Sequence, residues 1–407
     1  KPRQRLHLHH ALSAAQRIIE YMKTSRGLVD ISFAGSLRRW VETVGTIEIV
    51  ASGKKPAALI DYFLRFPMIL SSEVNGDNTC IAHFADNAVV SFTAVEPDDF
   101  ALTLFARTGS QAHVDKVTTH KPRKRSARLP RSEEEIYSRL GMQYVPPELR
   151  EDQGEVEAAL KSALPEDLLT MDDIKGMVHC HTTYSDGKHT LEQMVRAAEA
   201  MGMKYITITD HSPTAFYAGG LKVEELYRQW DEIDELQSSV KIKILRGTES
   251  DILADGGLDY PDRILEQLDC IVASVHARYK MDSRKMTERI VTAMRQPVFK
   301  VWGHALGRLI QRRPPFECDI ERILDVIAES KAAIEINGDP YRLDLEPRWV
   351  REARKRKIKF VISVDAHSMG ALANVKFGVA MARRGWVTRR EVLNTLSLTA
   401  FRKAVHP

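Results

Sequence analysis

The sequence predicts an α/β protein in which a (β/α)7 barrel follows a smaller α+β domain, and three observations lead to this prediction. The chain has 407 residues, too many for one ordinary hydrophobic core, so two or more domains are expected. From residue 176 onward, short apolar runs alternate with amphipathic helical patterns, which favours parallel strands. Residues 1–117 instead place several β-rich runs in succession between helical patterns.

Composition narrows the class of protein. Hydrophobic residues make up 43% and charged residues 28%, as in a soluble globular protein. No stretch of apolar residues is long enough to span a membrane, and the first residues do not lead into an apolar signal core. The four cysteines are scattered and form no CxxC pair, which suits a reducing, cytoplasmic location.

The first domain, residues 1–117, has alternating helical and β patterns. Helical spacing covers residues 4–25 and 56–64, and Pro97 opens a further helix that runs through Ala106. The predicted strands are "LVDISFAGS", "TIEIVAS", "MILSSEV", "TCIAHFA" and "AVVSFTAV".

Residues 118–175 form a predicted linker. Its basic stretch, "HKPRKRSARLPR" (120–131), is either a solvated connection or a contact for a phosphate backbone. A helix is expected in "SEEEIYSRLG", with Ser132 as its N-cap and Glu135 at the third position after it. The following segment, "YVPPELREDQGEVEAAL", is expected to be a connection broken by proline.

Residues 176–407 form the predicted barrel. Its seven strands are "GMVHCH", "YITITDH", "IKILRGTES", "CIVASVH", "FKVWGH", "AAIEIN" and "KFVISVDAH". Helices are expected between them near 190–201, 222–238, 284–295, 319–330, 346–357 and 388–404. Seven such units in about 230 residues fit a closed barrel better than an open sheet.

Ionisable side chains gather where these strands end, and they include six of the fourteen histidines. In a βα barrel all of these strand ends meet at one rim, where active sites are built. A single histidine at a strand end is more often structural than a ligand, but that explanation does not account for the joint pattern. Imidazole and carboxylate groups bind Zn²⁺, Mn²⁺ or Fe²⁺, and their number is sufficient for two or three divalent ions. The groups at or just after the strand ends are His179, His181, Asp186, Asp210, His211, Glu249, His276, His304, Glu335, Asp365 and His367.

The spacing of the pairs His179-x-His181 and Asp365-x-His367 has a geometric reason. Alternate residues of a strand point to the same face, so each pair could hold one ion. Cys180 should then point away from the site, into the core.

The motifs "HCHTTYSDG", "TDHS", "GTESDI", "SVHAR", "GHALGRL" and "SVDAH" resemble those of the PHP (polymerase and histidinol phosphatase) domain. The resemblance covers residues 176–407 and implies a distorted (β/α)7 barrel with up to three metal ions. It implies that His179, His181, Glu249 and Asp365 hold one ion. It also implies that Glu249, His276 and His304 hold a second, and that Asp186, His211 and His367 hold a third.

The whole chain resembles bacterial family X DNA polymerases. Besides the barrel, "FAGSLRRWVETVGTIEIV" is similar to the polymerase palm, and "FARTGSQAH" to the segment that holds the nucleotide sugar. By this resemblance a nucleotide triphosphate would lie against a vestigial site formed by Gly35, Ser36, Arg38 and Arg39. The resemblance also implies that DNA is a partner.

The palm motif departs from the family pattern at its metal-binding carboxylates. The family places three acidic residues there. At these positions this chain has Thr46, Glu48 and Ser91, so only one of the three is acidic. Two Mg²⁺ ions facing a triphosphate require that negative charge. We therefore expect nucleotidyl transfer to be lost.

The expected activity is that of a metal-dependent phosphoesterase, and the resemblance to family X DNA polymerases implies a 3′→5′ exonuclease or 3′-end-processing enzyme acting on DNA. Glu249 is expected to bridge two ions, Arg308 and Arg342 to hold phosphate oxygens, and Asp210 to orient a ligand histidine. For each arginine the alternative is a surface salt bridge. The alternative functions are a small-molecule phosphomonoester phosphatase of the histidinol-phosphate type and a non-catalytic DNA-binding scaffold.

Overall fold

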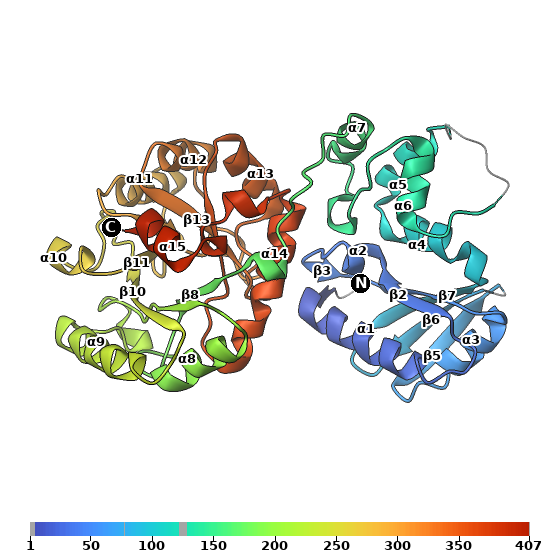
Figure 1. Cartoon of the computed structure of the whole chain (residues 1–407), viewed down its shortest axis with the longest axis horizontal. Helices are drawn as coiled ribbons and strands as arrows, with labels where there is room; N and C mark the ends of the chain where they lie inside the picture. The colour runs from blue at the N-terminus through green and yellow to red at the C-terminus, as the bar shows by residue number, and fades with distance from the viewer. Residues whose placement is uncertain (1–4, 77, 122–127, 407) are drawn as a thin grey trace. The chain divides into compact units, whose positions relative to one another are not determined.

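A computed structural model describes residues 5–76, 78–121 and 128–406 (Figure 1). The chain divides into two compact units, Lys1–Glu166 and Asp167–Pro407, which are treated separately below. Three of the six cations expected to contact a phosphate backbone, Arg123, Lys124 and Arg125, lie outside the described residues. The division of the first unit at residue 117 stays a prediction.

The first unit contains a five-stranded sheet in the order β2-β4-β7-β6-β5. These strands are β2 (Asp30–Ala34), β4 (Ile47–Ser52), β5 (Ile69–Asn75), β6 (Thr79–Phe84) and β7 (Val89–Val95). Strands β4 and β7 run parallel, whereas the other pairs are antiparallel. Helices α1 (Leu8–Met22) and α3 (Pro56–Phe63) bury apolar residues, and Phe63 stacks on Phe92 at 4.4 Å between ring centroids.

A group of helices completes this unit. They are α2 (Gly35–Arg38), α4 (Phe100–Thr108), α5 (Gln111–Thr118), α6 (Glu133–Leu140) and α7 (Glu155–Leu160). The expected cap of α6 is present, because the Ser132 hydroxyl accepts a hydrogen bond from the Glu135 amide. Helix α7 lies in the segment expected to be a broken connection, and α5 was not predicted.

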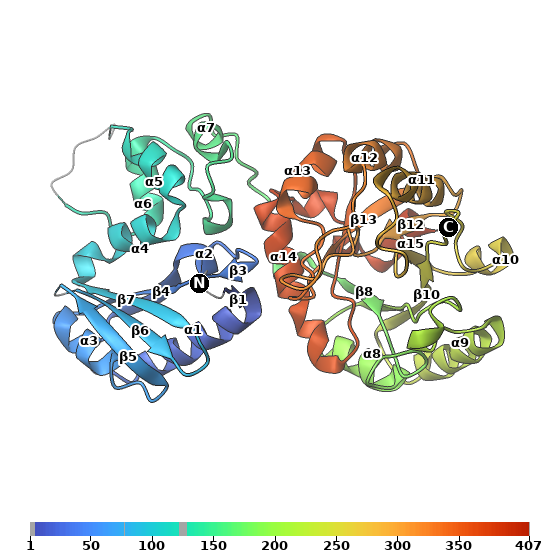
Figure 2. The ribbon, with the colours of Figure 1, turned by 180° about the vertical axis from the view of Figure 1, so that it is seen from behind.

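The second unit is a barrel whose seven strands are all parallel and lie in chain order, as the sequence predicted (Figure 2). The strands are β8 (Gly176–Cys180), β9 (Tyr205–Ile208), β10 (Lys243–Asp251), β11 (Cys270–Ser274), β12 (Lys300–Trp302), β13 (Ala332–Asn337) and β14 (Phe360–Ser363). The connecting helices are α8 (Leu191–Ala200), α9 (Val223–Gln237), α10 (Asp262–Leu265), α11 (Ser283–Met294), α12 (Ile320–Ala328), α13 (Pro347–Lys355) and α14 (Val375–Arg384). Most strand residues are buried, which explains the continuous apolar runs.

The barrel closes just beyond the ends of its first and last strands. The His181 amide donates to the Ala366 carbonyl at 2.8 Å, and the Ala366 amide donates to the His179 carbonyl at 3.0 Å. These two hydrogen bonds join the segment after β14 to the end of β8. The closure therefore involves both histidine-containing pairs identified in the sequence.

The C-terminal segment packs on the barrel core. Helix α15 (Leu398–Val405) places Phe401 on Tyr205, with 4.7 Å between ring centroids. The single helix expected over 388–404 is wrong, because two 3₁₀ turns precede α15. The buried Asn394 lies in one of these turns and hydrogen-bonds the backbone of Gly176 and Ile362, which fixes the turn against the strands. Within the described part of the chain, no helix is long and apolar enough to cross a membrane.

Candidate metal centre

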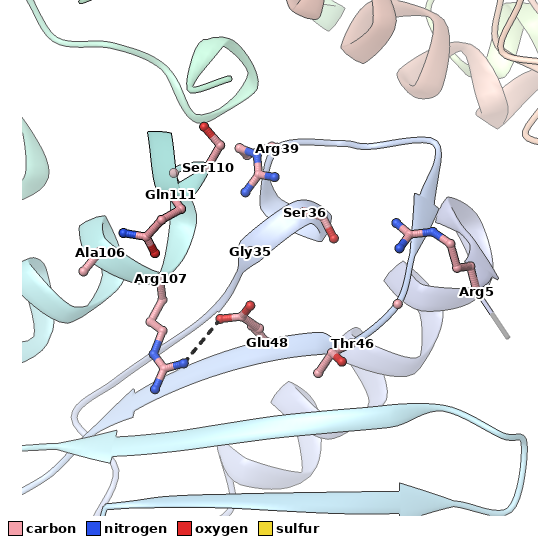
Figure 3. A pocket seen from close by; sticks show the side chains of 12 residues that line it. Arg5, Gly35, Ser36, Arg39, Thr46, Glu48, Ala106, Arg107, Ser110 and Gln111 are labelled. Atoms are coloured by element: carbon pink, nitrogen blue, oxygen red, sulfur yellow. Dashed lines mark ion pairs between the residues drawn. The ribbon is translucent and has the colours of Figure 1, made fainter. Parts of the chain in front are cut away.

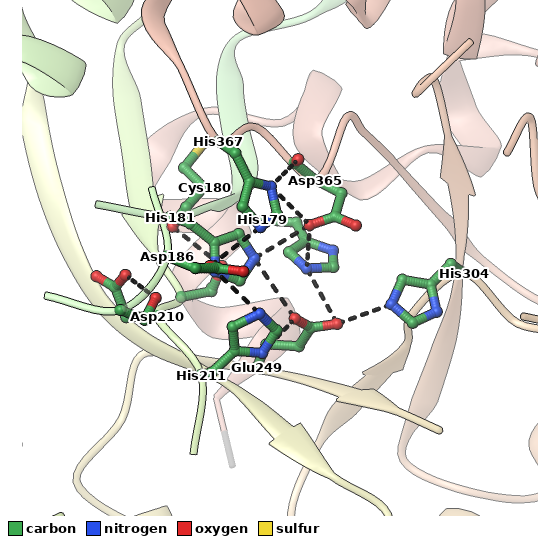
Figure 4. A network of polar contacts seen from close by, with 12 residues as sticks. His179, Cys180, His181, Asp186, Asp210, His211, Glu249, His304, Asp365 and His367 are labelled. Atoms are coloured by element: carbon green, nitrogen blue, oxygen red, sulfur yellow. Dashed lines mark hydrogen bonds and ion pairs between the residues drawn. The ribbon is translucent and has the colours of Figure 1, made fainter. Parts of the chain in front are cut away.

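The barrel brings all nine predicted ligands to one cluster (Figure 4). Their ligand atoms form three overlapping groups: His179, His181, Glu249 and Asp365; His181, Asp186, His211 and His367; and His211, Glu249 and His276. His304 lies beside these groups, with its Nε2 atom 2.9 Å from Glu249 Oε1. The first group equals the set expected for one ion. The other two differ from expectation because His211 and His181 are each shared between groups.

The donor atoms of this cluster suit divalent ions. Among the described residues, His179 Nε2, His181 Nε2, His211 Nδ1, Glu249 Oε2 and Asp365 Oδ1 are buried and have no hydrogen-bond partner. Buried polar atoms are normally satisfied, so a set of unsatisfied imidazole and carboxylate atoms requires a ligand of its own. Divalent metal ions would supply that ligand, because the neutral nitrogen and carboxylate oxygen donors match the preference of Zn²⁺, Mn²⁺ and Fe²⁺.

Three of the predicted ligand residues have unusual backbone conformations. His179, His304 and Asp365 have φ of +67°, +24° and +52°, in the region that side chains other than glycine rarely adopt. The pairing of β8 with β9 also shifts register between Met177 and Cys180. Strand alternation therefore predicted the partnership of His179 with His181 correctly, whereas Asp365 and His367 fall in different ligand groups. The convergence depends on an irregular strand end. Cys180 is fully buried, as expected for a core residue.

Two carboxylates hold the outer nitrogens of ligand histidines. Glu335 lies 2.6 Å from His179 Nδ1, and Asp251 lies 2.5 Å from His276 Nδ1. Each contact keeps the proton on Nδ1 and leaves Nε2 free to bind an ion. The sequence had shown Glu335 at a strand end without a role, and Asp251 was missed. The spacing Glu249-x-Asp251 was the available signal, because it places both carboxylates on one face of β10.

Opposite charges in the cluster stabilise one another. Burial alone would lower the pKa of His179, but Glu335, Glu249 and Asp365 raise it well above the usual value. Burial likewise opposes ionisation of Glu249, yet His276, His179 and His211 hold the pKa of this carboxyl well below its usual range. The cluster therefore keeps Glu249 ionised despite its complete burial.

Asp210 does not contact a ligand histidine, and the role expected for it is corrected. Its carboxylate accepts hydrogen bonds from the Thr182 amide at 2.8 Å, the Thr182 hydroxyl at 2.7 Å, the Ser185 hydroxyl at 2.5 Å and the Gln229 amide at 2.6 Å. Asp210 thus fixes the loop that carries Asp186.

The two arginines expected to hold phosphate lie in different environments. Arg308 donates to the Arg342 and Leu343 carbonyls and pairs with Glu346 at 2.7 Å, so it supports the loop after β13. Arg342 approaches the cluster itself, with its Nε atom 3.4 Å from Asp365 Oδ2. Its Nη1 atom is buried without a hydrogen-bond partner, so Arg342 has a donor available beside the cluster.

Apart from the metal centre, a cavity of about 710 Å³ lies in the first unit (Figure 3). Gly35, Ser36, Arg39, Thr46 and Glu48 are among its lining residues, as the palm resemblance implied. Burial raises the pKa of Glu48, whose nearest cation is Arg107 at 3.9 Å.

Ser91 and Arg38 are two further residues of the predicted palm site. Ser91 lies directly across from Glu48 in the sheet, so the altered carboxylate positions do come together. Arg38 does not line the cavity, because it binds Glu133 through both terminal nitrogens at 2.9 and 2.6 Å.

Comparison with known proteins agrees with both units. The PHP domain family matches residues 178–339. The chain is 34% identical over 416 residues to the DNA polymerase/3′-5′ exonuclease PolX of Bacillus subtilis, covering 98% of this chain and 72% of that protein. A probable phosphatase of Thermoanaerobacter is 28% identical over 235 residues, which are 53% of this chain and 89% of the relative. One of Caldanaerobacter subterraneus is 30% identical over 206 residues, which are 46% of this chain and 74% of the relative.

The barrel fold and the cluster of ligands fit the PHP family, and the similarity to PolX covers 98% of this chain. The protein is a hydrolase of phosphoester bonds, and it belongs to the PolX family of PHP-domain proteins.

Proposed function

We propose that the barrel removes nucleotides from the 3′ end of DNA with two or three divalent ions held by the nine clustered side chains. The observation that carries this proposal is the convergence of three ligand groups on Glu249 and its neighbours. One carboxylate can offer an oxygen to each of two ions, and Glu249 belongs to two of the groups.

Bound ions would supply the positive charge that polarises a phosphate group and favours attack by water. The protein's own residues orient the site. Glu335 and Asp251 set the tautomers of His179 and His276, and Asp210 holds the loop that carries Asp186. Arg342 offers a guanidinium donor to a phosphate oxygen, and Arg308 holds the loop from which Arg342 extends.

A small-molecule phosphatase is the second candidate. The probable phosphatases that resemble this chain align with the barrel portion, which supports phosphoester chemistry without requiring a nucleic acid. The DNA proposal rests instead on the PolX relative, whose similarity also includes the first unit. A non-catalytic scaffold would have no use for buried, unsatisfied ligand atoms.

The test uses the full chain and a 5′-labelled single-stranded oligonucleotide in Mn²⁺, alongside a panel of small phosphomonoesters. Stepwise shortening from the 3′ end is expected, together with loss of both activity and bound metal in His179→Ala/His181→Ala. His83→Ala, which changes an exposed histidine of the first unit, is the matched control. Rapid turnover of phosphomonoesters without shortening of the oligonucleotide would favour the phosphatase instead.

We also propose that the first unit no longer polymerises. Only Glu48 remains of the three carboxylates, and burial disfavours even its charged form. The residual cavity with Arg5, Arg39 and Arg107 keeps cations but lacks the anionic set that would hold two Mg²⁺ ions.

A further inference from the structure

A groove lies on the barrel beside the metal centre, and the metal chemistry does not use it. Its volume is about 720 Å³, and its walls are two loops, Arg278–Asp282 and Arg313–Glu317. The first loop begins just after His276, and the second follows His304, so both leave strands that carry predicted ligands. A cavity of this size is large enough for a nucleotide, whereas a phosphate group alone would fill little of it.

Tyr279 forms part of the groove wall, three residues after the predicted ligand His276. The Tyr279 ring stacks on Phe316 at 6.5 Å, and the Arg313 guanidinium lies over it at 3.9 Å. Gly307, three residues after His304, allows this packing, because a Cβ atom there would lie 3.0 Å from the Tyr279 ring. Tyr279 and Phe316 thus give the groove a packed aromatic wall.

Cations line the outer part of the groove. Arg278 and Lys280 are exposed, and neither forms an ion pair with any described residue. Arg278 also has φ of +60°, a strained conformation for a residue with a side chain, and such strain concentrates at functional sites. Asp282, the nearest acidic residue in sequence, already caps helix α11 through the Lys285 amide.

Two exposed aromatic residues lie on the loop after β9, which also carries His211. Phe216 and Tyr217 are 82% and 62% exposed, with ring centroids 5.9 Å apart. The same loop borders the segment that carries Asp186, because a Cβ atom on Gly219 would lie 3.5 Å from the Ser185 carbonyl oxygen. Adjacent aromatic rings left in solvent beside a catalytic cluster indicate a binding surface.

Aromatic rings combined with unpaired cations are the features that bind single-stranded nucleic acid. Bases stack on the rings whatever their sequence, while lysine and arginine follow the phosphates. We propose that Phe216 and Tyr217 stack on the last bases of a DNA 3′ end, and that Arg278 and Lys280 hold the phosphates behind the bond being cut. This inference rests on the proposed exonuclease function and adds the residues that select a strand over a small phosphoester.

The first experiment measures stacking directly, without metal. An oligonucleotide with 2-aminopurine at its 3′ end is titrated with the full-length protein in EDTA. Fluorescence quenching is expected with the native chain and should be lost in Phe216→Ala/Tyr217→Ala. Tyr227→Ala, an exposed tyrosine on α9, is the control and should quench normally. Equal quenching by the double variant would overturn the stacking assignment.

The second experiment measures exonuclease kinetics in Mn²⁺. The aromatic double variant should raise KM for the oligonucleotide roughly tenfold, with kcat changed much less, because stacking stabilises the bound substrate. The same variant should lose far less on bis(p-nitrophenyl) phosphate, a small diester without bases. Equal losses on both substrates would overturn the inference, because the residues would then serve the reaction centre in general.

The cations have a separate test. In Arg278→Ala/Lys280→Ala, the slope of log affinity against log salt should become shallower by about 1.4, as expected for two lost contacts to a single strand. Arg295→Ala, an exposed arginine after α11, should leave the slope unchanged. An unchanged slope in the double variant would remove these residues from the binding surface.

The outcomes distinguish failure of this inference from failure of the proposed exonuclease function. If the native chain does not shorten oligonucleotides at all, the proposed function fails. If it shortens them and the aromatic variant binds and reacts like the native chain, only the inference fails.

Discussion

Replacing Glu335 with glutamine should weaken metal binding although no metal ligand is changed. One carboxylate oxygen accepts from His179 Nδ1 at 2.6 Å and from the Ser363 hydroxyl. The other accepts from the His304 amide and from Asn337 Nδ2. All four partners are donors, and glutamine can present only one oxygen to them.

Either orientation of the glutamine side chain places its NH₂ group against a donor. If the NH₂ group faces His179, the imidazole must shift its proton to Nε2 and loses the lone pair that would bind an ion. If the side chain flips, the NH₂ group faces the fixed His304 amide and leaves two buried donors in conflict. One mispaired buried group costs about 1–3 kcal/mol, which corresponds to a metal affinity roughly 5–150-fold weaker.

Competition between the protein and a chromogenic chelator for Zn²⁺ or Mn²⁺ measures this affinity. Glu329→Gln, at an exposed glutamate after α12, is the matched control and should bind like the native protein. Thermal unfolding in EDTA separates the structural cost of the substitution from its effect on the metal. A Glu335→Gln protein that is folded and binds metal within twofold of the native protein would refute the tautomer argument.

Three further predictions concern other parts of the molecule. Asp251→Asn should lower the metal retained after dialysis, because it disturbs His276 as Glu335→Gln disturbs His179; full retention, measured by elemental analysis, would contradict this. Primer extension should be undetectable with Mg²⁺ or Mn²⁺, whereas Thr46→Asp/Ser91→Asp should introduce Mg²⁺ binding in the first unit, measured calorimetrically. Burial lowers the pKa of Lys300 to about 8, so the unfolded chain holds the extra proton above that pH. The unfolding free energy should therefore rise between about pH 8 and 10.5, relative to Lys300→Met, by roughly 1–3 kcal/mol in denaturant titrations.

The barrel could be predicted because its strands are buried on both faces and therefore appear as apolar runs. The helices that were missed have less distinct patterns. Helix α14 contains Gly378 in its interior, and that glycine lies close to the strand backbone, where a Cβ atom would be 3.2 Å from the Ile336 carbonyl oxygen. The segment around Asn394 has helical spacing, but hydrogen bonds to the barrel interrupt the helix there.

The clustering of ligands could be predicted, whereas their supporting contacts could not. Residue type and position at strand ends identified every member of the cluster. The role predicted for Asp210, orienting a ligand histidine, was wrong because the folded chain turns its carboxylate toward Thr182 and Ser185. The backbone at His179 and Asp365 adopts positive φ, which no local sequence pattern reveals for these residue types.

Because the barrel closes between its first and last strands, a metal ion bound there would stabilise the folded chain against unfolding. His179 lies on the first strand, Asp365 lies just after the last strand, and both belong to one ligand group, so an ion between them would link the two ends of the sheet. Such a link closes a very long loop of chain, as a disulfide would, and removes conformational entropy from the unfolded state. Metal removal would thus favour local opening at the junction between these strands while the rest of the barrel stays folded, and protease cleavage after chelation should begin in the segments that flank this junction.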